Sequence, residues 1–274
     1  MEIRDEAHVW LVDPAVADVG ERLGRYQALL DNDDRLRQRR FVFEPDRRAF
    51  AVTRALVRTA LSRYAAVAPS SWCFARSDHG RPLVTGPPKG LGLSFSVTHT
   101  RGLIACLITR HPCAAIDVEA IQPVDDALEI ATRYFAAREV AALRAQRGVD
   151  RDRLFLALWT LKEAYLKARG RGLTLPLDSA TFSLGEGTID AVVDDEGQDI
   201  GSGFWTFQLL RPSSTHILAL ARSHATADSP DVKCFRTIPL EEEEAIVLPI
   251  EAVGKASVRG REKSSEDRPA RTLS

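Results

Sequence analysis

The sequence predicts an α+β protein built from two similar lobes. Each half of the 274-residue chain runs through a long amphipathic helix into a group of short strands. Each half also ends in a similar strand, TRGLIACLIT at residues 100–109 and STHILALAR at residues 214–222. A repeated order of elements indicates two related units. We expect one lobe over residues 1–110 and the other over residues 111–240, followed by a disordered tail over residues 241–274.

The first half begins with a strand at residues 8–12, which Asp13 and Pro14 end. Helical spacing follows at residues 22–30 and 35–43. A longer helix is expected at residues 46–66, where apolar residues recur at steps of three and four beneath an arginine-rich face. The strand-like segments that follow are SWCFAR, LGLSFSVTHT, GLIACLIT and CAAIDVEAI, interrupted by the Gly- and Pro-rich stretch HGRPLVTGPPKG.

The second half repeats this order. Two helices are expected at residues 126–147 and 152–169. Strands are expected at residues 180–184, 188–193, 204–210 and 217–222, and CFRTIPLEE could add an edge strand. Beyond it, the acidic run at residues 241–244 and the Lys-, Arg-, Ser- and Glu-rich end of the chain have too few apolar residues to pack.

Composition and charge exclude several classes of function. The formal net charge is −1, so the chain has no overall field that would attract nucleic acid or an anionic membrane. The first residues lack the basic start and apolar run of a signal peptide, and no apolar stretch approaches the roughly 20 residues that span a bilayer. We therefore expect a cytoplasmic protein with neither nucleic acid nor membrane as partner.

Two acidic residues in CAAIDVEAI point to a metal site. The period of two in a strand places Ile116 and Val118 on one face and Asp117 and Glu119 on the other. Carboxylates that close repel each other unless a cation lies between them, and hard oxygen ligands suit Mg²⁺. The alternative is a strand end with one solvated face.

The helix LFLALWTLKEAYLKARG offers a third carboxylate and two lysines. Lys162 falls inside its apolar arc, while Glu163 and Lys167 lie side by side at the edge of that arc. With Asp117 and Glu119, Glu163 would hold Mg²⁺ and leave room for a pyrophosphate, whose charge would suit both lysines. Alternatively, Lys162 extends its head to water and Glu163 pairs with Lys167 on the surface, which stabilises a helix by only about 0.2–0.5 kcal/mol.

The motif AIDVE, followed about 45 residues later by WTLKEAYLKARG, resembles the signature of the 4'-phosphopantetheinyl transferase superfamily, of the surfactin-synthetase-activating type. Upstream, RRFVFEPDRRAFAVTRALVR, GRPLV and FSVTHT also resemble family motifs, as does GRGLTLPLDS downstream, so the resemblance covers residues 39–179. It implies a pseudo-twofold pair of α+β lobes that bind coenzyme A in the cleft between them.

The resemblance also implies roles for single residues. Asp117, Glu119 and Glu163 would be the Mg²⁺ ligands, Glu163 would also be the general base, and Lys167 would lie beside the pyrophosphate of coenzyme A. His99 would contact a phosphate and assist catalysis, with Thr98 beside it. Arg81 and Pro82, which with Gly80 match the family's GRP, would border the adenosine of coenzyme A, and Arg48, and with less support Arg47, would lie near its 3'-phosphate. Lys162 is expected to bind coenzyme A because of its place on the helix.

The function that the resemblance implies is Mg²⁺-dependent transfer of the phosphopantetheine arm of coenzyme A to a serine of an acyl or peptidyl carrier protein, with release of 3',5'-ADP. The segment ATRYFAAREVAALRA, including Tyr134 and Phe135, would help to dock the carrier protein, unless the aromatic rings belong to the core. We expect a monomer. The alternative function is a non-catalytic module that binds coenzyme A or a carrier protein; a nucleic-acid binder using residues 35–48 fits the net charge poorly.

Overall fold

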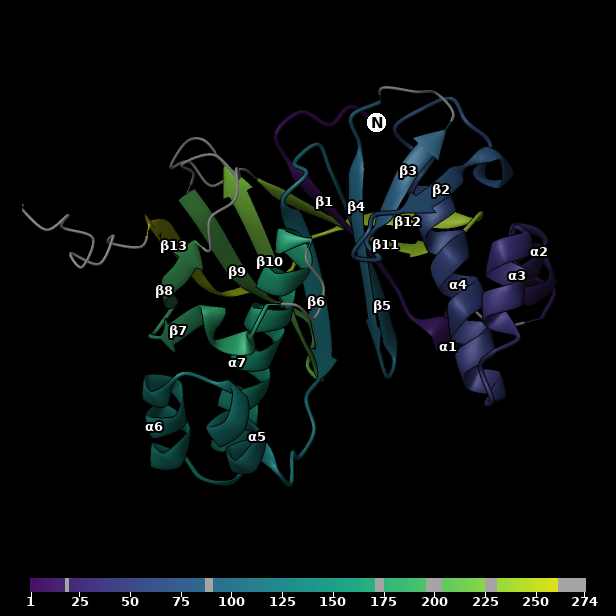
Figure 1. Cartoon of the computed structure of the whole chain (residues 1–274). Helices are drawn as coiled ribbons and strands as arrows, with labels where there is room; N and C mark the ends of the chain where they lie inside the picture. Colours follow the sequence, from purple (N-terminus) through teal and green to yellow (C-terminus); the bar gives the residue numbers. More distant parts are fainter. Residues whose placement is uncertain (18–19, 87–90, 171–174, 196–203, 225–230, 261–274) are drawn as a thin grey trace, which may run out of the picture.

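The computed structural model describes residues 1–17, 20–86, 91–170, 175–195, 204–224 and 231–260, and contains two main sheets that meet in the middle of the molecule (Figure 1). The first sheet has the strand order β12-β11-β1-β5-β4 and the second β6-β10-β9-β13-β8-β7, while β2 and β3 form a separate hairpin. The elements up to residue 109 are β1 (Ala7–Val12), α1 (Pro14–Ala17), α2 (Arg22–Ala28), α3 (Asn32–Gln38), α4 (Glu44–Leu61), β2 (Cys73–Arg76), β3 (Pro82–Gly86), β4 (Ser94–Thr100) and β5 (Leu103–Thr109).

The rest of the chain first builds the second lobe. Its elements are β6 (Ala114–Ala120), α5 (Ala127–Tyr134), α6 (Ala137–Ala145), α7 (Gly148–Arg169), β7 (Ala180–Leu184), β8 (Thr188–Asp195), β9 (Phe204–Ser213) and β10 (His216–His224). The last strands are β11 (Val232–Ile238), β12 (Glu242–Ile246) and β13 (Ile250–Gly260). In both lobes the first strand pairs antiparallel with the second strand of a hairpin, β1 with β5 of β4–β5 and β6 with β10 of β9–β10. The predicted pair of similarly built α+β lobes is confirmed.

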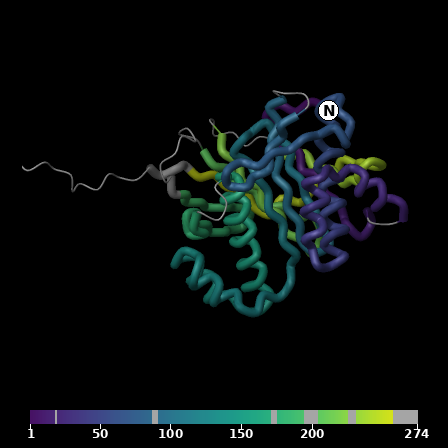
Figure 2. The backbone as a smooth tube through the Cα atoms, turned by 45° about the vertical axis from the view of Figure 1, so that its right-hand side comes forward, coloured from purple at the N-terminus to yellow at the C-terminus, as the bar shows by residue number. Residues whose placement is uncertain are grey.

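Three apolar clusters form the core. α4 covers one face of the first sheet, with Val57 and Leu61 buried against it, and α7 covers one face of the second sheet with Leu161 and Tyr165. The third cluster, which includes Leu107, fills the space between the two sheets. Figures 1 and 2 show α4 and α7 on opposite sides of the strands. No helix within the described ranges has the length and apolar character needed to cross a membrane.

The helices expected at residues 22–30, 46–66 and 152–169 are α2, α4 and α7 with shifted ends, and the other two predicted helices differ more. The helix expected at residues 126–147 is divided into α5 and α6, because Phe135 is extended and its ring is buried against Phe155 at 5.4 Å between centroids. α6 then starts anew, since the Glu139 carboxylate accepts the Ala136 N–H at 2.9 Å. The helix expected at residues 35–43 is α3, which begins earlier, after Asp31 accepts the Asp34 N–H, and ends at Gln38. In the Gly- and Pro-rich stretch, β3 forms a hairpin with β2.

The expected disordered tail over residues 241–274 is wrong for residues 242–260. β11 is not an edge strand but lies between β12 and β1, parallel to β1, and β13 lies between β9 and β8. The acidic run is ordered because β12 pairs antiparallel with β11, while its glutamates stay at the surface. There arginines of the first lobe contact it: Arg22 and Arg25 contact Glu241, and Arg63 contacts Glu243 at 2.5 Å. Residues 232–246 therefore complete the first sheet, and residues 261–274 lie outside the described part.

Candidate active site

The candidate active site is built on β6, an edge strand of the second sheet. Ile116 and Val118 are buried in the core between the two sheets, so the alternation of the strand turns Asp117 and Glu119 to the face covered by α7. The Asp117 side chain is buried and that of Glu119 is half-buried. The two carboxylates share one face of β6, as predicted, and this face is only partly open to solvent.

α7 contributes Glu163 and Lys167, which lie one turn apart on the same side of the helix. The Lys167 ammonium donates to Asp117 Oδ1 at 2.5 Å, and 37% of the Lys167 side chain is exposed. Lys167 is therefore not half of a simple surface pair with Glu163. Its ion pair with Asp117 connects α7 to β6, and its charge lies at the solvent-exposed side of the site.

The surroundings of Glu119 and Glu163 disfavour the charged form of both carboxyl groups. Burial, followed by repulsion from Asp117, raises the pKa of the Glu119 carboxyl to about 7. Burial also raises the pKa of Glu163, an effect that Lys167 opposes and Asp117 reinforces. Three carboxyl groups and one ammonium thus interact within a partly dry space, and the acidic groups outnumber the cation.

The donor set of the site suits a divalent cation. Asp117 Oδ2 is buried and has no hydrogen-bond partner among the described residues, although Oδ1 of the same carboxylate has two. An unsatisfied carboxylate oxygen beside a carboxyl with a raised pKa favours an added cation, and oxygen ligands suit Mg²⁺. As they stand, no three such side chains in the described ranges converge closely enough to hold a metal ion. Glu119, Glu163 and Lys167 would have to adjust around a bound cation.

Thr98 and His99 of the neighbouring strand β4, both predicted to bind coenzyme A, lie on opposite faces of that strand. Thr98 is buried and donates its hydroxyl to Asp117 Oδ1 at 2.9 Å, so this hydroxyl faces the carboxylates. His99 is exposed, and strand alternation places its side chain on the opposite face of β4. The structure therefore brings Thr98 to the acidic centre and leaves His99 outside it.

The prediction that Lys162 binds coenzyme A is wrong. Its side chain is 0% exposed, and its ammonium pairs with the equally buried Glu139 at 2.8 Å. The same ammonium donates to the carbonyls of Leu177 at 2.9 Å and Ala180 at 2.5 Å. These partners enclose the charge in the core of the second lobe, so Lys162 neither reaches water nor faces the carboxylates of β6.

Arg81 joins the two lobes. Its guanidinium donates to Ser94 Oγ at 3.4 Å in the first lobe and to the carbonyls of Ala114 and Ala168 at 3.1 and 3.3 Å in the second. Burial lowers its pKa, as expected for a cation held by neutral carbonyls. Its side chain therefore has a structural role at the lobe junction, separate from any contact of Gly80–Pro82 with a ligand.

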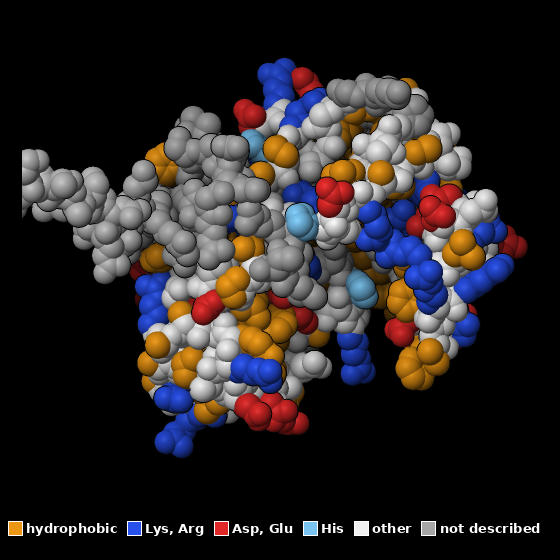
Figure 3. Space-filling view, in the orientation of Figure 1, with side chains coloured by type: hydrophobic (Ala, Val, Ile, Leu, Met, Phe, Trp, Pro, Cys, Tyr) orange, Lys and Arg blue, Asp and Glu red, His pale blue; other side chains and the backbone are white. Residues whose placement is uncertain are grey.

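A cavity of about 540 Å³ with charged walls lies beside Pro82. Four arginines line it, Arg37, Arg40, Arg54 and Arg76, together with three aspartates, Asp31, Asp33 and Asp34. The Arg54 guanidinium pairs with Asp34 at 2.8 Å, which leaves the other three arginines to supply the excess of positive charge in the cavity. Burial lowers the pKa of Arg37, and the charges of Arg76 and Arg54 lower it further. Figure 3 shows Lys and Arg side chains gathered over α3 and α4. An anion would relieve this repulsion.

Sequence reasoning found only part of this cavity. It noted the basic stretch at residues 35–48 but favoured Arg48, which contacts Glu44 at 3.3 Å, as Arg47 also does at 3.0 Å. Nothing in the sequence indicates that Arg54 and Arg76 join Arg37 and Arg40 at one cavity, because they come from separate elements.

The two aromatic residues at the end of α5, Tyr134 and Phe135, lie in different environments. Phe135 is buried against Phe155, and the Lys162 ammonium lies 4.9 Å from the centre of its ring, so it belongs to the core. Tyr134 is 43% exposed, with the Arg133 guanidinium 5.2 Å from its ring centre. Of the two, only Tyr134 is available on the surface.

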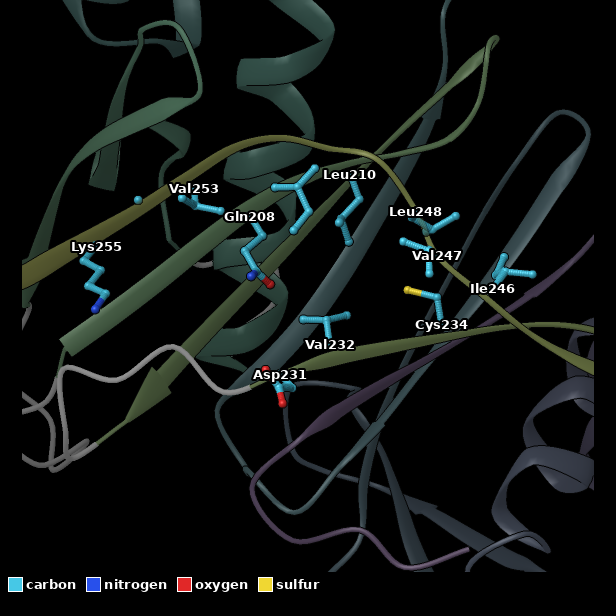
Figure 4. A pocket seen from close by; sticks show the side chains of 12 residues that line it. Gln208, Leu210, Asp231, Val232, Cys234, Ile246, Val247, Leu248, Val253 and Lys255 are labelled. Atoms are coloured by element: carbon cyan, nitrogen blue, oxygen red, sulfur yellow. The ribbon is translucent and has the colours of Figure 1, made fainter.

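A second cavity, of about 510 Å³, lies away from these residues. It is lined by residues of β9, β11 and β13 and by the segment between β12 and β13, including Leu210, Val232, Val247 and Val253 (Figure 4). None of the predicted site residues lines it. Its walls are largely apolar, with Asp231 and Lys255 as charged residues, so it lacks the carboxylate cluster that characterises the site on β6.

Comparisons with known proteins agree with this arrangement. A model of the 4'-phosphopantetheinyl transferase superfamily matches residues 114–221, and a model of the N-terminal part of 4'-phosphopantetheinyl transferase matches residues 20–110. The first match contains β6 and α7, and the second contains α4 and β4. The chain is an enzyme of the transferase class.

Individual relatives define the family. The chain is 32% identical over 171 residues to the 4'-phosphopantetheinyl transferase HetI of Nostoc sp.. This match covers 62% of this chain and 71% of the relative. The chain is also 30% identical over 160 residues to the 4'-phosphopantetheinyl transferase Sfp of Bacillus subtilis, covering 58% and 69%. A phosphopantetheinyl transferase of Thraustochytrium sp. is 29% identical over 242 residues, or 82% of each chain. The chain belongs to the 4'-phosphopantetheinyl transferase superfamily.

Proposed function

We propose that this chain transfers the 4'-phosphopantetheine group of coenzyme A to a serine of an acyl or peptidyl carrier protein. The observation that carries the proposal is the group formed by Asp117, Glu119, Glu163 and Lys167, where a buried carboxylate oxygen beside a lysine lacks a partner among the residues that the structure describes. Such a centre suits a divalent cation together with the diphosphate of coenzyme A, the group in which the phosphoryl-type transfer takes place. The named relatives support the substrate class.

The residues divide the chemistry among themselves. Glu163, whose pKa is raised by burial, takes the proton of the carrier serine. The serine oxygen then bonds to the β-phosphorus of coenzyme A, the bond from that phosphorus to the bridging oxygen breaks, and 3',5'-ADP leaves. Lys167 offsets the charge that develops on the departing phosphate. Mg²⁺ held by Asp117, Glu119 and Glu163 would supply further charge neutralisation at the diphosphate.

The arginine-lined cavity supports a place for the nucleotide end of coenzyme A. Pro82 lines the cavity and belongs to the GRP motif, and Arg37, Arg40 and Arg76 supply charge for a phosphate on the ribose. His99, exposed on β4, is proposed to contact a phosphate between this cavity and the carboxylates. Lys162 is not part of the proposed binding site for coenzyme A, because it is buried in the second lobe. Arg48 belongs to the basic surface over α4, and no separate contact with coenzyme A is proposed for it.

The direct test is the intact mass of an apo carrier protein after incubation with this chain, coenzyme A and Mg²⁺. A gain of the phosphopantetheine mass that EDTA suppresses, together with release of 3',5'-ADP, is expected. Binding of coenzyme A without any gain across several carrier proteins would favour the non-catalytic binding module. Light scattering of the same sample is expected to give the mass of a monomer, 30.2 kDa.

The variants Asp117→Ala and Glu163→Gln test the acidic centre. Each should lower the rate of transfer at least about a hundredfold, the scale on which loss of a proton acceptor or of charge stabilisation acts. Glu44→Gln is the matched control, because Glu44 is an exposed carboxylate that contacts the arginines of α4. Transfer by Glu163→Gln at the rate of the Glu44→Gln control would contradict the assignment.

A further inference from the structure

The edges of the two main sheets meet side by side without a backbone ladder. β4 is the edge of the first sheet and β6 is the edge of the second. An edge strand has unpaired N–H and C=O groups that need partners. At this seam the partners are side-chain hydroxyls of β4, which recur at every second position and therefore share one face of the strand. These residues are Ser94, Ser96, Thr98 and Thr100.

Two of these hydroxyls take the place of a backbone ladder. Ser96 Oγ accepts the N–H of Ile116 at 3.4 Å, and Thr100 Oγ1 accepts the N–H of Ala120 at 3.2 Å. Both bonds join residues 20 positions apart in the sequence, so β4 and β6 run in the same direction in a fixed register. The two lobes are therefore aligned by side-chain oxygens along this seam.

The same row of hydroxyls reaches the carboxylates. Thr98 Oγ1 donates to Asp117 Oδ1 at 2.9 Å, and Thr100 Oγ1 donates to Glu119 Oε2 at 3.4 Å. Oδ1 of Asp117 is thus engaged, and within the described part of the chain the buried Oδ2 is left without a partner. A hydroxyl that holds one oxygen of a carboxylate fixes the direction in which the other oxygen points, and such outer contacts tune ligands.

We propose that Thr98 and Thr100 are positioning residues that hold Asp117 and Glu119, from the opposite lobe, in the orientation that binds a divalent cation. The proposal rests on the proposed function, since it assigns the cation to these carboxylates. It makes the affinity for the cation depend on the register between the lobes. Thr98 thereby acts through Asp117, and no contact of its hydroxyl with coenzyme A is required.

Mn²⁺ is the probe, because its binding is followed by electron paramagnetic resonance without any turnover. Thr98→Val removes the hydroxyl and keeps the branched shape, and it should weaken Mn²⁺ binding at least about tenfold, the loss typical for an outer contact of a metal ligand. Thr98→Ser restores the donor and should stay within about twofold of wild type. Thr100→Val should also weaken binding, by less than Thr98→Val, because its bond to Glu119 is longer.

Thr109→Val is the matched control. Thr109 is a buried threonine of the adjacent strand β5, and its hydroxyl donates to the backbone carbonyl of Glu6. Thermal unfolding reports any loss of stability in this variant separately, and its Mn²⁺ affinity should equal that of wild type. A purely structural role for Thr98 would lower the unfolding temperature of Thr98→Val and leave the affinity of its folded fraction unchanged.

The outcomes separate the two proposals. If wild type transfers the phosphopantetheine group and binds Mn²⁺, but Thr98→Val and Thr100→Val bind it as tightly as wild type, the positioning role is wrong and the function stands. If wild type neither binds Mn²⁺ nor transfers the group, both are wrong. Weaker binding by Thr98→Val with recovery in Thr98→Ser supports the positioning role.

Discussion

Lys162 and Glu163 are neighbours on α7 that reach opposite environments. One residue step turns the helix by 100°, which carries Glu163 to the edge facing β6 and Lys162 into the core. The sequence predicted the edge position of Glu163 and Lys167 correctly, because periodicity alone determines it. It did not predict the partner of Lys162, since Glu139 lies on a different helix and only packing brings the two together.

The buried pair gives a prediction about stability. Lys162→Met should lower the free energy of unfolding by about 3–5 kcal/mol, because it leaves the Glu139 carboxylate buried without its cation. The double variant with Glu139→Gln should recover part of this loss. Urea unfolding measures both, and Lys233→Met, which removes an exposed partner of Glu6, is the control. A Lys162→Met protein as stable as that control would contradict the structural role.

Two buried histidines predict a loss of stability in acid. Burial lowers the pKa of His8 and of His224 to about 4, so between these values and their ordinary pKa the two side chains bind fewer protons in the folded chain than in the unfolded chain. Their contribution to stability should therefore fall as the pH decreases from about 6.5, the ordinary pKa of histidine, to about 4, while Glu119, whose pKa is raised to about 7, acts in the opposite direction. His8→Phe should make this dependence shallower in urea unfolding. His79→Phe, at an exposed histidine, should not change it.

At the scale of elements, β4 could be predicted from the sequence, whereas β13 could not. The alternation in SFSVTHT predicted a strand, and the structure shows that its hydroxyl face lines the seam with β6. The sequence could not show this seam, because it depends on which sheet edges meet. β13 was not predicted, since its residues include Glu251, Gly254 and Lys255 and lack a clear apolar alternation.

Gly254 predicts how closely β13 fits. A Cβ added at this position would lie 1.9 Å from the carbonyl oxygen of Ile189 on β8, so any side chain would push the strands apart. Gly254→Ala should lower the melting temperature by several degrees, as a loss of about 1 kcal/mol or more does in a chain of this size. Gly24→Ala, in the open on α2, should be neutral or stabilising. Equal melting temperatures for Gly254→Ala and wild type would contradict this packing of β13.

At the scale of the whole molecule, the sequence predicted two similar lobes but not the route of the chain between them. The repeated order of helix and hairpin was visible because it is local in sequence. The return of β11 to β1 was not, since a parallel pairing between residues 7–11 and 232–236 leaves no local pattern. The division at about residue 110 remains a prediction, with the amendment that residues 232–246 belong to the first sheet.

This route predicts the behaviour of split chains. A fragment of residues 1–110 lacks β11, which pairs along β1, and should be largely unfolded by circular dichroism. Co-expression with residues 111–274 should restore the fold and the transfer activity, because the two pieces together supply every strand of the first sheet. A cooperatively folded fragment of residues 1–110 would contradict the dependence on β11.

The pairing of β1 with β11 also has a consequence for synthesis. β1 leaves the ribosome before its parallel neighbour β11, which emerges only after β6 to β10 and the helices between them have been made. One edge of β1 therefore stays unpaired throughout this interval, at a stage when exposed strand edges favour aggregation. Slow translation of this message should demand more help from chaperones than translation of a chain whose strands pair in the order in which they appear.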